Sequence, residues 1–255
     1  LVKAYVKIIE RRDDSLHRPV HFALQVGILN AQYEFAAMVD MVELSPSTPL
    51  STVDALIADA CENHFHSLGC PYCYHPYVME KLRAAGMDGK IVLLGGGGFP
   101  DGNWPTEAKL ASIAVCLSNG CGEIDLTTNL GWMKSGMWEA FHQEVAKVRR
   151  LTRGVPMKAI LHTPMLTQEE TRRACEILLA EGVDYVKTDT GRSPAPTTVD
   201  QVRLLREIVG GAMKIKASGG IRTVDTVLEM AEAGADRFGM SRSSAMRIYA
   251  ALPER

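Results

Sequence analysis

The sequence predicts an α/β protein, namely a TIM (β/α)8 barrel that follows an N-terminal helical extension. Three observations lead to this prediction. Short β-rich runs alternate with longer helical patterns, the alternation repeats eight times, and 255 residues suit a single barrel domain with a short extension. We expect the extension to cover residues 1–36 and the barrel to cover residues 37–255, with no linker between further domains.

The predicted strands are short and rich in apolar residues, and cover 37–42, 68–74, 90–94, 123–127, 157–161, the residues around Tyr185, 213–217 and 237–240. The predicted helices have apolar residues at helical spacing, and cover 52–67, 76–85, 106–118, 137–150, 167–181, 198–209, 223–233 and 243–251. This alternation predicts a parallel sheet. An open doubly wound sheet is less favoured, because residues 95–98 are four glycines followed by Phe99-Pro100, which we interpret as a loop.

Composition excludes several classes of protein. Twenty-eight Lys and Arg residues against 30 Asp and Glu residues give a formal charge of −2, which argues against a strongly basic nucleic-acid binder. No apolar run approaches the roughly 18 residues of a membrane span. The six cysteines are too sparse for a disulfide scaffold, so we expect a cytoplasmic protein. From the charge and the apolar runs we expect no nucleic-acid or membrane partner.

Three charged residues interrupt strands that should be almost wholly apolar in a parallel barrel. Asp125, Lys187 and Lys216 each lie near the C-terminal end of a predicted strand. Barrel enzymes place their chemistry at this end, so we expect the three side chains to meet in one cavity. A second ammonium group lowers the pKa of a neighbouring lysine, and the free amine can then form a Schiff base with a carbonyl. A carboxylate beside it can move protons.

The loops after the last two predicted strands favour an anion. Residues 218–223 contain Gly219 and Gly220 and lead into a helix, and residues 238–241 contain Gly239 and do the same. Glycines allow close backbone approach, and the amides of helix N-termini bind phosphate. Phosphate sites recur at these two loops in barrels, so we expect one here.

These segments together resemble the deoxyribose-phosphate aldolase family of class I aldolases. The resemblance is carried by Glu123-Ile124-Asp125-Leu126, Val186-Lys187-Thr188-Asp189-Thr190-Gly191 and residues 214–223, and extends over roughly residues 37–250. It implies the reversible cleavage of 2-deoxy-D-ribose 5-phosphate to D-glyceraldehyde 3-phosphate and acetaldehyde without a metal or other cofactor. Barrels of this sort commonly pair, so we expect a homodimer.

The resemblance also implies roles by position. Lys187 would form the Schiff base, Lys216 would lower its pKa, and Asp125 would transfer protons through water. The phosphate would be surrounded by Thr190, Gly191, Gly219, Gly220, Gly239 and Ser241. Weaker similarities and neighbouring positions add Asp40, Cys73 and Arg242 as possible site residues.

Three positions depart from the family pattern. Val42 stands where the family usually has a hydroxyl, Asp189 replaces the serine of Lys-Thr-Ser-Thr-Gly, and Arg242 follows Ser241 where a second serine is common. The preferred aldehyde could therefore differ, which leaves two alternatives. One is a Schiff-base aldolase with another phosphorylated substrate, and the other is a catalytically silent barrel that binds a phosphorylated metabolite or a partner protein.

The cysteine-rich segment suggests two further hypotheses that we favour less. Cys70-Pro71-Tyr72-Cys73 is similar to a redox pair, but such pairs lie where a helix begins in much smaller folds. A zinc site is a second hypothesis, because Cys61, His64, His66, Cys70, Cys73 and His75 fall within 15 residues. These residues are divided between a predicted helix and a strand with its turn, so we expect no metal.

Overall fold

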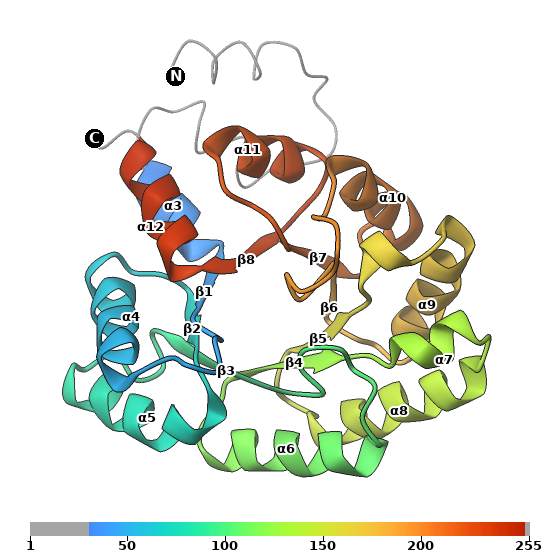
Figure 1. The fold of residues 1–255 in the computed structure, drawn as a ribbon, viewed down its shortest axis with the longest axis horizontal. Coiled ribbons are helices and arrows are strands. Elements are labelled where there is room, and N and C mark those ends of the chain that lie inside the picture. Colours follow the sequence, from blue (N-terminus) through green and yellow to red (C-terminus); the bar gives the residue numbers. More distant parts are fainter. Residues whose placement is uncertain (1–30, 253–255) are drawn as a thin grey trace.

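The computed structural model describes residues 31–252, and in this range eight parallel strands close into a barrel. Figure 1 shows the ring of strands with helices around it. The strands are β1 (Val39–Val42), β2 (Ser67–Gly69), β3 (Val92–Gly97), β4 (Glu123–Thr127), β5 (Met157–Ile160), β6 (Tyr185–Lys187), β7 (Lys214–Ser218) and β8 (Arg237–Ser241). Each strand pairs with the next, and β8 pairs with β1. The predicted TIM barrel is confirmed.

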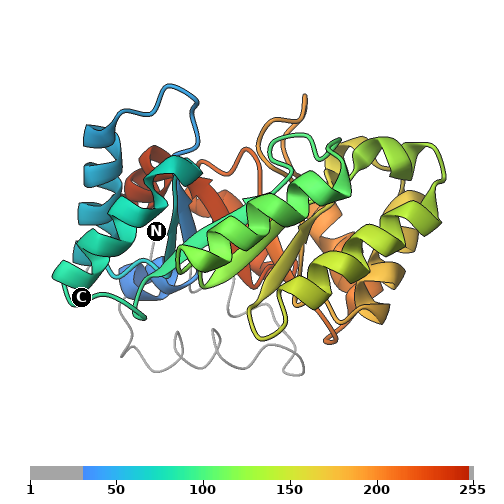
Figure 2. The same ribbon diagram turned by 90° about the horizontal axis from the view of Figure 1, so that it is seen from below.

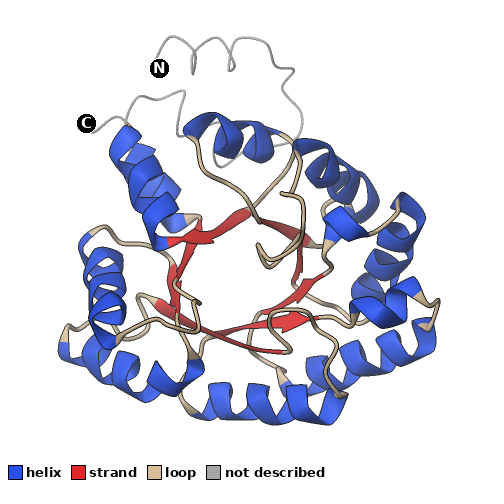
Figure 3. Cartoon of the chain, viewed as in Figure 1, coloured by secondary structure: helices blue, strands red, loops and turns tan. Residues whose placement is uncertain are grey.

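Helices cover the outside of the barrel, as the colouring in Figure 3 shows. The α-helices are α3 (Ala31–Ala37), α4 (Leu50–Glu62), α5 (His75–Ala84), α6 (Thr106–Ser118), α7 (Leu130–Lys134), α8 (Trp138–Leu151), α9 (Gln168–Ala180), α10 (Val199–Val209), α11 (Val224–Glu232) and α12 (Arg242–Ala251). Two 3₁₀ helices are η1 (Tyr72–Tyr74) and η2 (Thr163–Met165). The predicted extension over residues 1–36 lies outside the described residues, apart from most of α3.

Local sequence explains where the helices after the later strands begin. Thr167 and Thr198 form capping boxes with Glu170 and Gln201, so α9 and α10 start with their first amides hydrogen-bonded. Ser241 is the N-cap of α12, and its hydroxyl accepts a hydrogen bond from the amide of Ser244. These caps define the first residue of each helix. They therefore also define where the loop between the preceding strand and the helix ends.

Several predicted boundaries were wrong. The second strand ends at Gly69 instead of residue 74, because Pro71 has no amide for the sheet and η1 follows it. The first strand begins at Val39, since Ala37 ends α3. The short helices α7, η1 and η2 are too brief for a periodic pattern and were not predicted.

The glycine run at residues 95–98 is mostly strand, which corrects its interpretation as a loop. Gly95, Gly96 and Gly97 belong to β3. A Cβ at Gly95 would lie 2.5 Å from the Cβ of Cys116 in α6, and one at Gly96 would lie 2.2 Å from the carbonyl oxygen of Asp125. Glycine is therefore needed here for close packing of β3 against its neighbours, and not for a flexible turn.

The interior of the barrel holds a layer of charged side chains. TIM barrels usually fill this space with branched apolar residues. Here the strands direct buried charged residues toward one another across the barrel, namely Asp40, Glu123, Lys158, Lys216 and Arg237. Figure 2 shows the barrel from the side, with the loops that follow the strands at one end. In residues 31–252, no helix combines the length and apolar character needed to cross a membrane.

Candidate active site

Asp125 brings the two predicted site lysines together at the C-terminal ends of β4, β6 and β7. Lys187 Nζ donates a hydrogen bond of 2.7 Å to Asp125 Oδ2, and Lys216 Nζ donates one of 3.0 Å to the same oxygen. The three side chains come from separate strands, so their contact depends on barrel closure. The predicted cluster of two amines and one carboxylate is present as a contiguous group.

The surroundings of Lys187 favour its neutral, nucleophilic form. Burial lowers the pKa of Lys187 to about 8; the cations of Lys216 and Lys158 also lower it, while Asp125 opposes the shift. The side chain of Lys187 is 13% exposed, whereas that of Lys216 is 1% exposed. Both lysines line the cavity, and Lys187 is the more accessible of the two.

Asp125 stays ionised despite its burial. Desolvation would raise the pKa of this carboxyl group, but Lys158, Lys187 and Lys216 hold it well below its usual range. The second carboxylate oxygen, Oδ1, accepts a hydrogen bond of 3.0 Å from Lys158. Asp125 is thus a fixed negative charge beside the amine of Lys187.

A second layer of charges lies beneath this cluster. Lys158 Nζ contacts Glu123 at 2.5 Å, and Arg237 contacts Asp40 Oδ1 at 2.9 Å. Lys216 Nζ lies 2.5 Å from Asp40 Oδ2. Four Lys and Arg side chains and three carboxylates form the network, namely Lys158, Lys187, Lys216 and Arg237 with Asp40, Glu123 and Asp125, and His66 adjoins it at Glu123. This excess of basic groups favours the release of one proton, and Lys187 is the most accessible of the lysines.

Sequence reasoning missed Lys158 and Arg237. Both are buried charged residues on strands, which was the signal that identified Asp125, Lys187 and Lys216. They lie near the N-terminal ends of β5 and β8. The prediction considered only charged residues near the C-terminal ends of strands and therefore missed both. Asp40 was proposed as a possible site residue, and the structure places it in this lower layer, fully buried and absent from the cavity lining.

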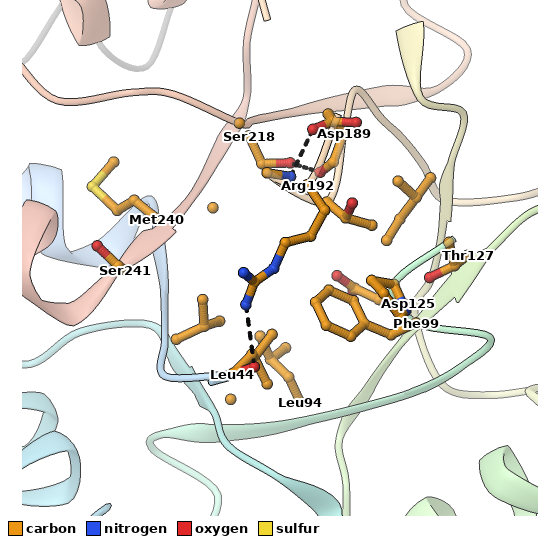
Figure 4. Close-up of a pocket in the computed structure, with 18 of the residues that line it drawn as sticks. Leu44, Leu94, Phe99, Asp125, Thr127, Asp189, Arg192, Ser218, Met240 and Ser241 are labelled. Carbon is orange, nitrogen blue, oxygen red and sulfur yellow. Dashed lines mark hydrogen bonds between the residues drawn. The ribbon is translucent and has the colours of Figure 1, made fainter. Parts of the chain in front are cut away.

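The amine cluster opens into a cavity of about 890 Å³ at the C-terminal end of the barrel. Figure 4 shows Asp125 on one side of this cavity and Ser218 and Asp189 on another. The lining contains all six residues predicted to surround a phosphate, namely Thr190, Gly191, Gly219, Gly220, Gly239 and Ser241. The hydroxyl oxygen of Thr190 is buried without a hydrogen-bond partner among the described residues. An unpaired hydroxyl in a cavity wall is available to a ligand.

Asp189 organises the loop after β6 at the cavity wall. Its carboxylate accepts hydrogen bonds of 2.6 Å from the Gly191 amide and 2.5 Å from the Ser193 hydroxyl, and it lies 3.2 Å from His162 Nδ1. Burial would raise the pKa of Asp189, but His162, Ser193 and the Gly191 amide lower it. The loop therefore contains a buried negative charge. The amide of Gly191 is hydrogen-bonded to this carboxylate.

Arg192 supplies positive charge above this loop. Figure 4 shows its side chain extending across the cavity, and its Nη2 donates a hydrogen bond of 3.5 Å to the carbonyl oxygen of Leu44. Among the described residues, no carboxylate forms a salt bridge with this guanidinium. Arg222 also lines the cavity and is exposed. Neither arginine was singled out as an anion-binding residue in the sequence.

The other two possible site residues lie away from the cavity wall. Cys73 is exposed in η1 and does not line the cavity, although its neighbours Pro71 and Tyr72 do. The guanidinium of Arg242 turns to Asp59 in α4, at 2.6 Å, because α12 packs beside the first part of the barrel. The structure therefore gives no contact between either side chain and the cavity.

The cysteine and histidine segment is also dispersed. All six cysteines of the chain lie in the described region and are free thiols. His66 faces Glu123 inside the barrel, whereas His75 faces Cys121 outside it, so the hypothesis of one zinc site from residues 61–75 does not fit the structure. In the proposed redox pair, the Cys70 thiol is buried whereas the Cys73 thiol is exposed, and both are free.

The closed barrel and the buried amine cluster at its C-terminal end define a (β/α)8-barrel enzyme. Comparison with known proteins gives the family. Residues 96–245 match the family described as DeoC/LacD family aldolase. The deoxyribose-phosphate aldolase of Desulfitobacterium hafniense strain DCB-2 is 38% identical over 208 residues, which cover 81% of this chain and 94% of the relative. The chain therefore belongs to the DeoC/LacD aldolase family.

Other relatives and solved structures agree with this assignment. The deoxyribose-phosphate aldolase of Thermococcus kodakarensis is 36% identical over 227 residues, covering 87% of this chain and 98% of the relative. An aldolase called QR15 superposes with a TM-score of 0.79 at 29% identity, over 86% of this chain and 95% of the other. The deoxyribose phosphate aldolase of Aeropyrum pernix, described as a unique tetramer, gives 0.79 at 27%, over 89% and 94%.

Proposed function

We propose that the protein is a class I aldolase that reversibly cleaves 2-deoxy-D-ribose 5-phosphate into D-glyceraldehyde 3-phosphate and acetaldehyde. The observation that carries the proposal is the 2.7 Å contact between Lys187 Nζ and Asp125 Oδ2, with Lys216 on the same oxygen. A lysine whose pKa is lowered toward neutral pH beside an ionised carboxylate is equipped for Schiff-base chemistry. Curated relatives at 33–38% identity carry this activity in their names.

The amine of Lys187 starts the reaction. Its lone pair attacks the aldehyde carbon of the open-chain sugar, and the carbonyl oxygen leaves as water to give an iminium ion. Removal of the proton from the hydroxyl at C3 turns this carbon into a new aldehyde as the C2–C3 bond breaks. The electrons of that bond move to the iminium nitrogen and form an enamine. Protonation of the enamine at C2 and hydrolysis then release acetaldehyde and restore the amine.

Asp125 and Lys216 support these steps in different ways. Asp125 is ionised, so it can accept the hydroxyl proton and return one to the enamine, directly or through a water molecule. Lys216 is buried between Asp125 and Asp40, and its positive charge lowers the pKa of Lys187. We assign Lys216 the role of keeping Lys187 deprotonated and Asp125 in place.

The phosphate group would lie at the end of the cavity formed by the loops after β6, β7 and β8. Glycine backbone in these loops and the N-terminus of α12 offer amides to an anion. Arg192 and Arg222 add positive charge. We propose that Arg192 exchanges its weak contact with the Leu44 carbonyl for the phosphate, because a charge-assisted hydrogen bond is stronger than one of 3.5 Å to a neutral oxygen.

Borohydride trapping tests the proposed function directly. The protein is incubated with acetaldehyde, reduced with borohydride, digested and analysed by mass spectrometry. We expect a single ethyl adduct on Lys187 and none in Lys187→Leu, which should also lose turnover. Modification of another lysine, or no adduct with ligand binding retained, would contradict the proposal and favour a silent metabolite-binding barrel.

A second candidate function keeps the Schiff base and changes the substrate. It is favoured by the buried carboxylate of Asp189 at the anion end and by the apolar side chain of Val42 in the cavity lining. Comparing kcat/KM for 2-deoxyribose 5-phosphate, unphosphorylated 2-deoxyribose and other phosphorylated aldehydes separates the two. Preference for another phosphorylated aldehyde would establish the second candidate.

We also propose a cytoplasmic enzyme of carbohydrate degradation that acts as a homodimer. Free thiols at all six cysteines fit a reducing compartment. The oligomeric state is measured by light scattering with size-exclusion chromatography. A mass corresponding to one chain, or to four as in the tetramer described for the Aeropyrum pernix protein, would replace the dimer.

A further inference from the structure

Three metal-ligating side chains converge outside the catalytic cavity, between β3 and the helices α5 and α6. They are His75 at the start of α5, Cys116 near the end of α6, and Cys121 just before β4. One ligand atom from each lies within 4.8 Å of the other two, and His75 Nδ1 lies 3.3 Å from Cys121 Sγ. The three residues are 0%, 0% and 4% exposed.

The backbone leaves room for this cluster at one point. A Cβ at Gly95 would lie 3.0 Å from the sulfur of Cys116 and 3.0 Å from that of Cys121. Any other residue at this position would therefore press on both sulfurs. The turn that follows α6 directs the second thiol toward the first, because the Cys121 amide bonds to the Cys116 carbonyl at 3.1 Å. The two sulfurs thus face one small space from a fixed backbone.

The imidazole of His75 makes few hydrogen bonds in the described region. Its Nε2 atom is buried without a hydrogen-bond partner among the described residues, and its Nδ1 faces the Cys121 sulfur. Nδ1 is therefore the nitrogen that the ring presents to the thiols, and a cation bound there would replace its contact with Cys121.

The two sulfurs and the imidazole are ligand types that zinc prefers in proteins. Thiolate is the form of cysteine that binds metals. Two thiolates and a neutral imidazole carry a charge of −2, and a divalent cation would neutralise it within the buried space.

We propose that His75, Cys116 and Cys121 form a binding site for a thiophilic divalent cation of the Zn²⁺ type, separate from the aldolase chemistry. Sulfur and imidazole ligands select such ions over Mg²⁺ or Ca²⁺. Three protein ligands leave the fourth tetrahedral position to water. The cation would stabilise the wall behind the active site, because Cys116 Sγ contacts the carbonyl of Gly96, which pairs in register with Asp125.

Metal binding is tested on the full chain by equilibrium dialysis of metal-free protein against Zn²⁺, with metal content measured by mass spectrometry. We expect one Zn²⁺ per chain in the unmodified protein. The double variant Cys116→Ala/Cys121→Ala should lose it. The matched control, Cys61→Ala/Cys73→Ala, removes two thiols outside the cluster and should retain it. Absence of Zn²⁺ from the unmodified protein, or retention by the first variant, overturns the proposal.

Two measurements on the unmodified protein keep the test decisive if the first variant does not fold. Bound Co²⁺ should give the absorption of thiolate-to-metal charge transfer. Zn²⁺ should slow alkylation of Cys116 and Cys121 at least tenfold, as mapped by peptide mass spectrometry, without protecting Cys73. A Co²⁺ spectrum without thiolate bands, or unchanged alkylation, overturns the site. Borohydride trapping at Lys187 is read separately, so failure of either proposal does not imply failure of the other.

Discussion

The ammonium group of Lys216 lies 2.5 Å from Asp40 Oδ2 inside the barrel, and the same lysine lines the cavity. This contact holds the lysine side chain, which also donates to Asp125 on its other side. Since Asp40 is itself held by Arg237 and by the Ser67 hydroxyl, Lys216 has a fixed position below the nucleophile. Its charge therefore acts on Lys187 from a constant distance.

The first prediction concerns the pH dependence of Schiff-base formation. With the pKa of Lys187 lowered to about 8, the fraction of free amine rises about tenfold per pH unit below pH 8 and levels off above it. The rate of trapping with subsaturating acetaldehyde should follow this curve. In Lys216→Met a like charge is lost, so the midpoint should move to higher pH.

The control for this prediction is Lys214→Met, which removes an exposed lysine from the same strand. Its midpoint should equal that of the unmodified protein. A midpoint near the ordinary lysine value in the unmodified protein would show that Lys187 is not activated as proposed.

The second prediction separates the roles of Asp125 and Lys187. Asp125→Asn removes the proton acceptor but leaves the amine, so turnover should fall by about 10² or more while an adduct on Lys187 can still be trapped. Steady-state kinetics and peptide mass spectrometry measure the two effects. Equal loss of both would mean that Asp125 acts mainly by holding Lys187.

The third prediction concerns stability. Lys158 is fully buried and contacts Glu123 and Asp125, so Lys158→Met removes one basic partner from each of two buried carboxylates. Loss of one partner from a buried ionic group costs about 3–5 kcal/mol, and the free energy of unfolding should fall by that order. Urea unfolding followed by circular dichroism measures it.

A surface pair gives the comparison for Lys158. Lys147 contacts Glu107 at 3.3 Å on exposed parts of α8 and α6, and Lys147→Met should change the free energy of unfolding by less than about 1 kcal/mol. Similar effects of the two substitutions would show that the interior network does not stabilise the barrel.

The fourth prediction tests Arg192 as a phosphate ligand. Arg192→Leu should raise KM for 2-deoxyribose 5-phosphate by about tenfold, since a partly exposed charge-assisted hydrogen bond is lost. The kcat/KM for unphosphorylated 2-deoxyribose should stay the same. Arg203→Leu on α10, whose guanidinium pairs with Asp200, is the control and should change neither value. A rise in KM for both substrates alike would contradict a role at the phosphate.

The barrel could be predicted from the sequence because eight strand–helix units repeat with little interruption. Charges in buried strands are rare, and this made Asp125, Lys187 and Lys216 visible. Residues 95–98 were misread because a glycine run gives the same signal whether it turns freely or packs closely. Only the approach of Cys116 from α6 shows which is true.

Contacts between distant residues explain the rest of what sequence reasoning did not find. Arg242 pairs with Asp59, 183 positions away, and no local pattern predicts that its side chain turns from the cavity. Lys158 meets Glu123 because β5 pairs with β4, and Arg237 meets Asp40 because β8 pairs with β1 when the barrel closes. The roles assigned to the site residues remain predictions for the experiments above.

The charged groups that set the reactivity of Lys187 all belong to strands, whereas Asp189, Arg192, Gly191, Gly219 and Gly220 at the anion end belong to loops. The two sets are thus separable in the chain. Exchange or mutagenesis of the loops can therefore alter which aldehyde is bound. The charged residues on the strands, which set the pKa of Lys187, stay the same.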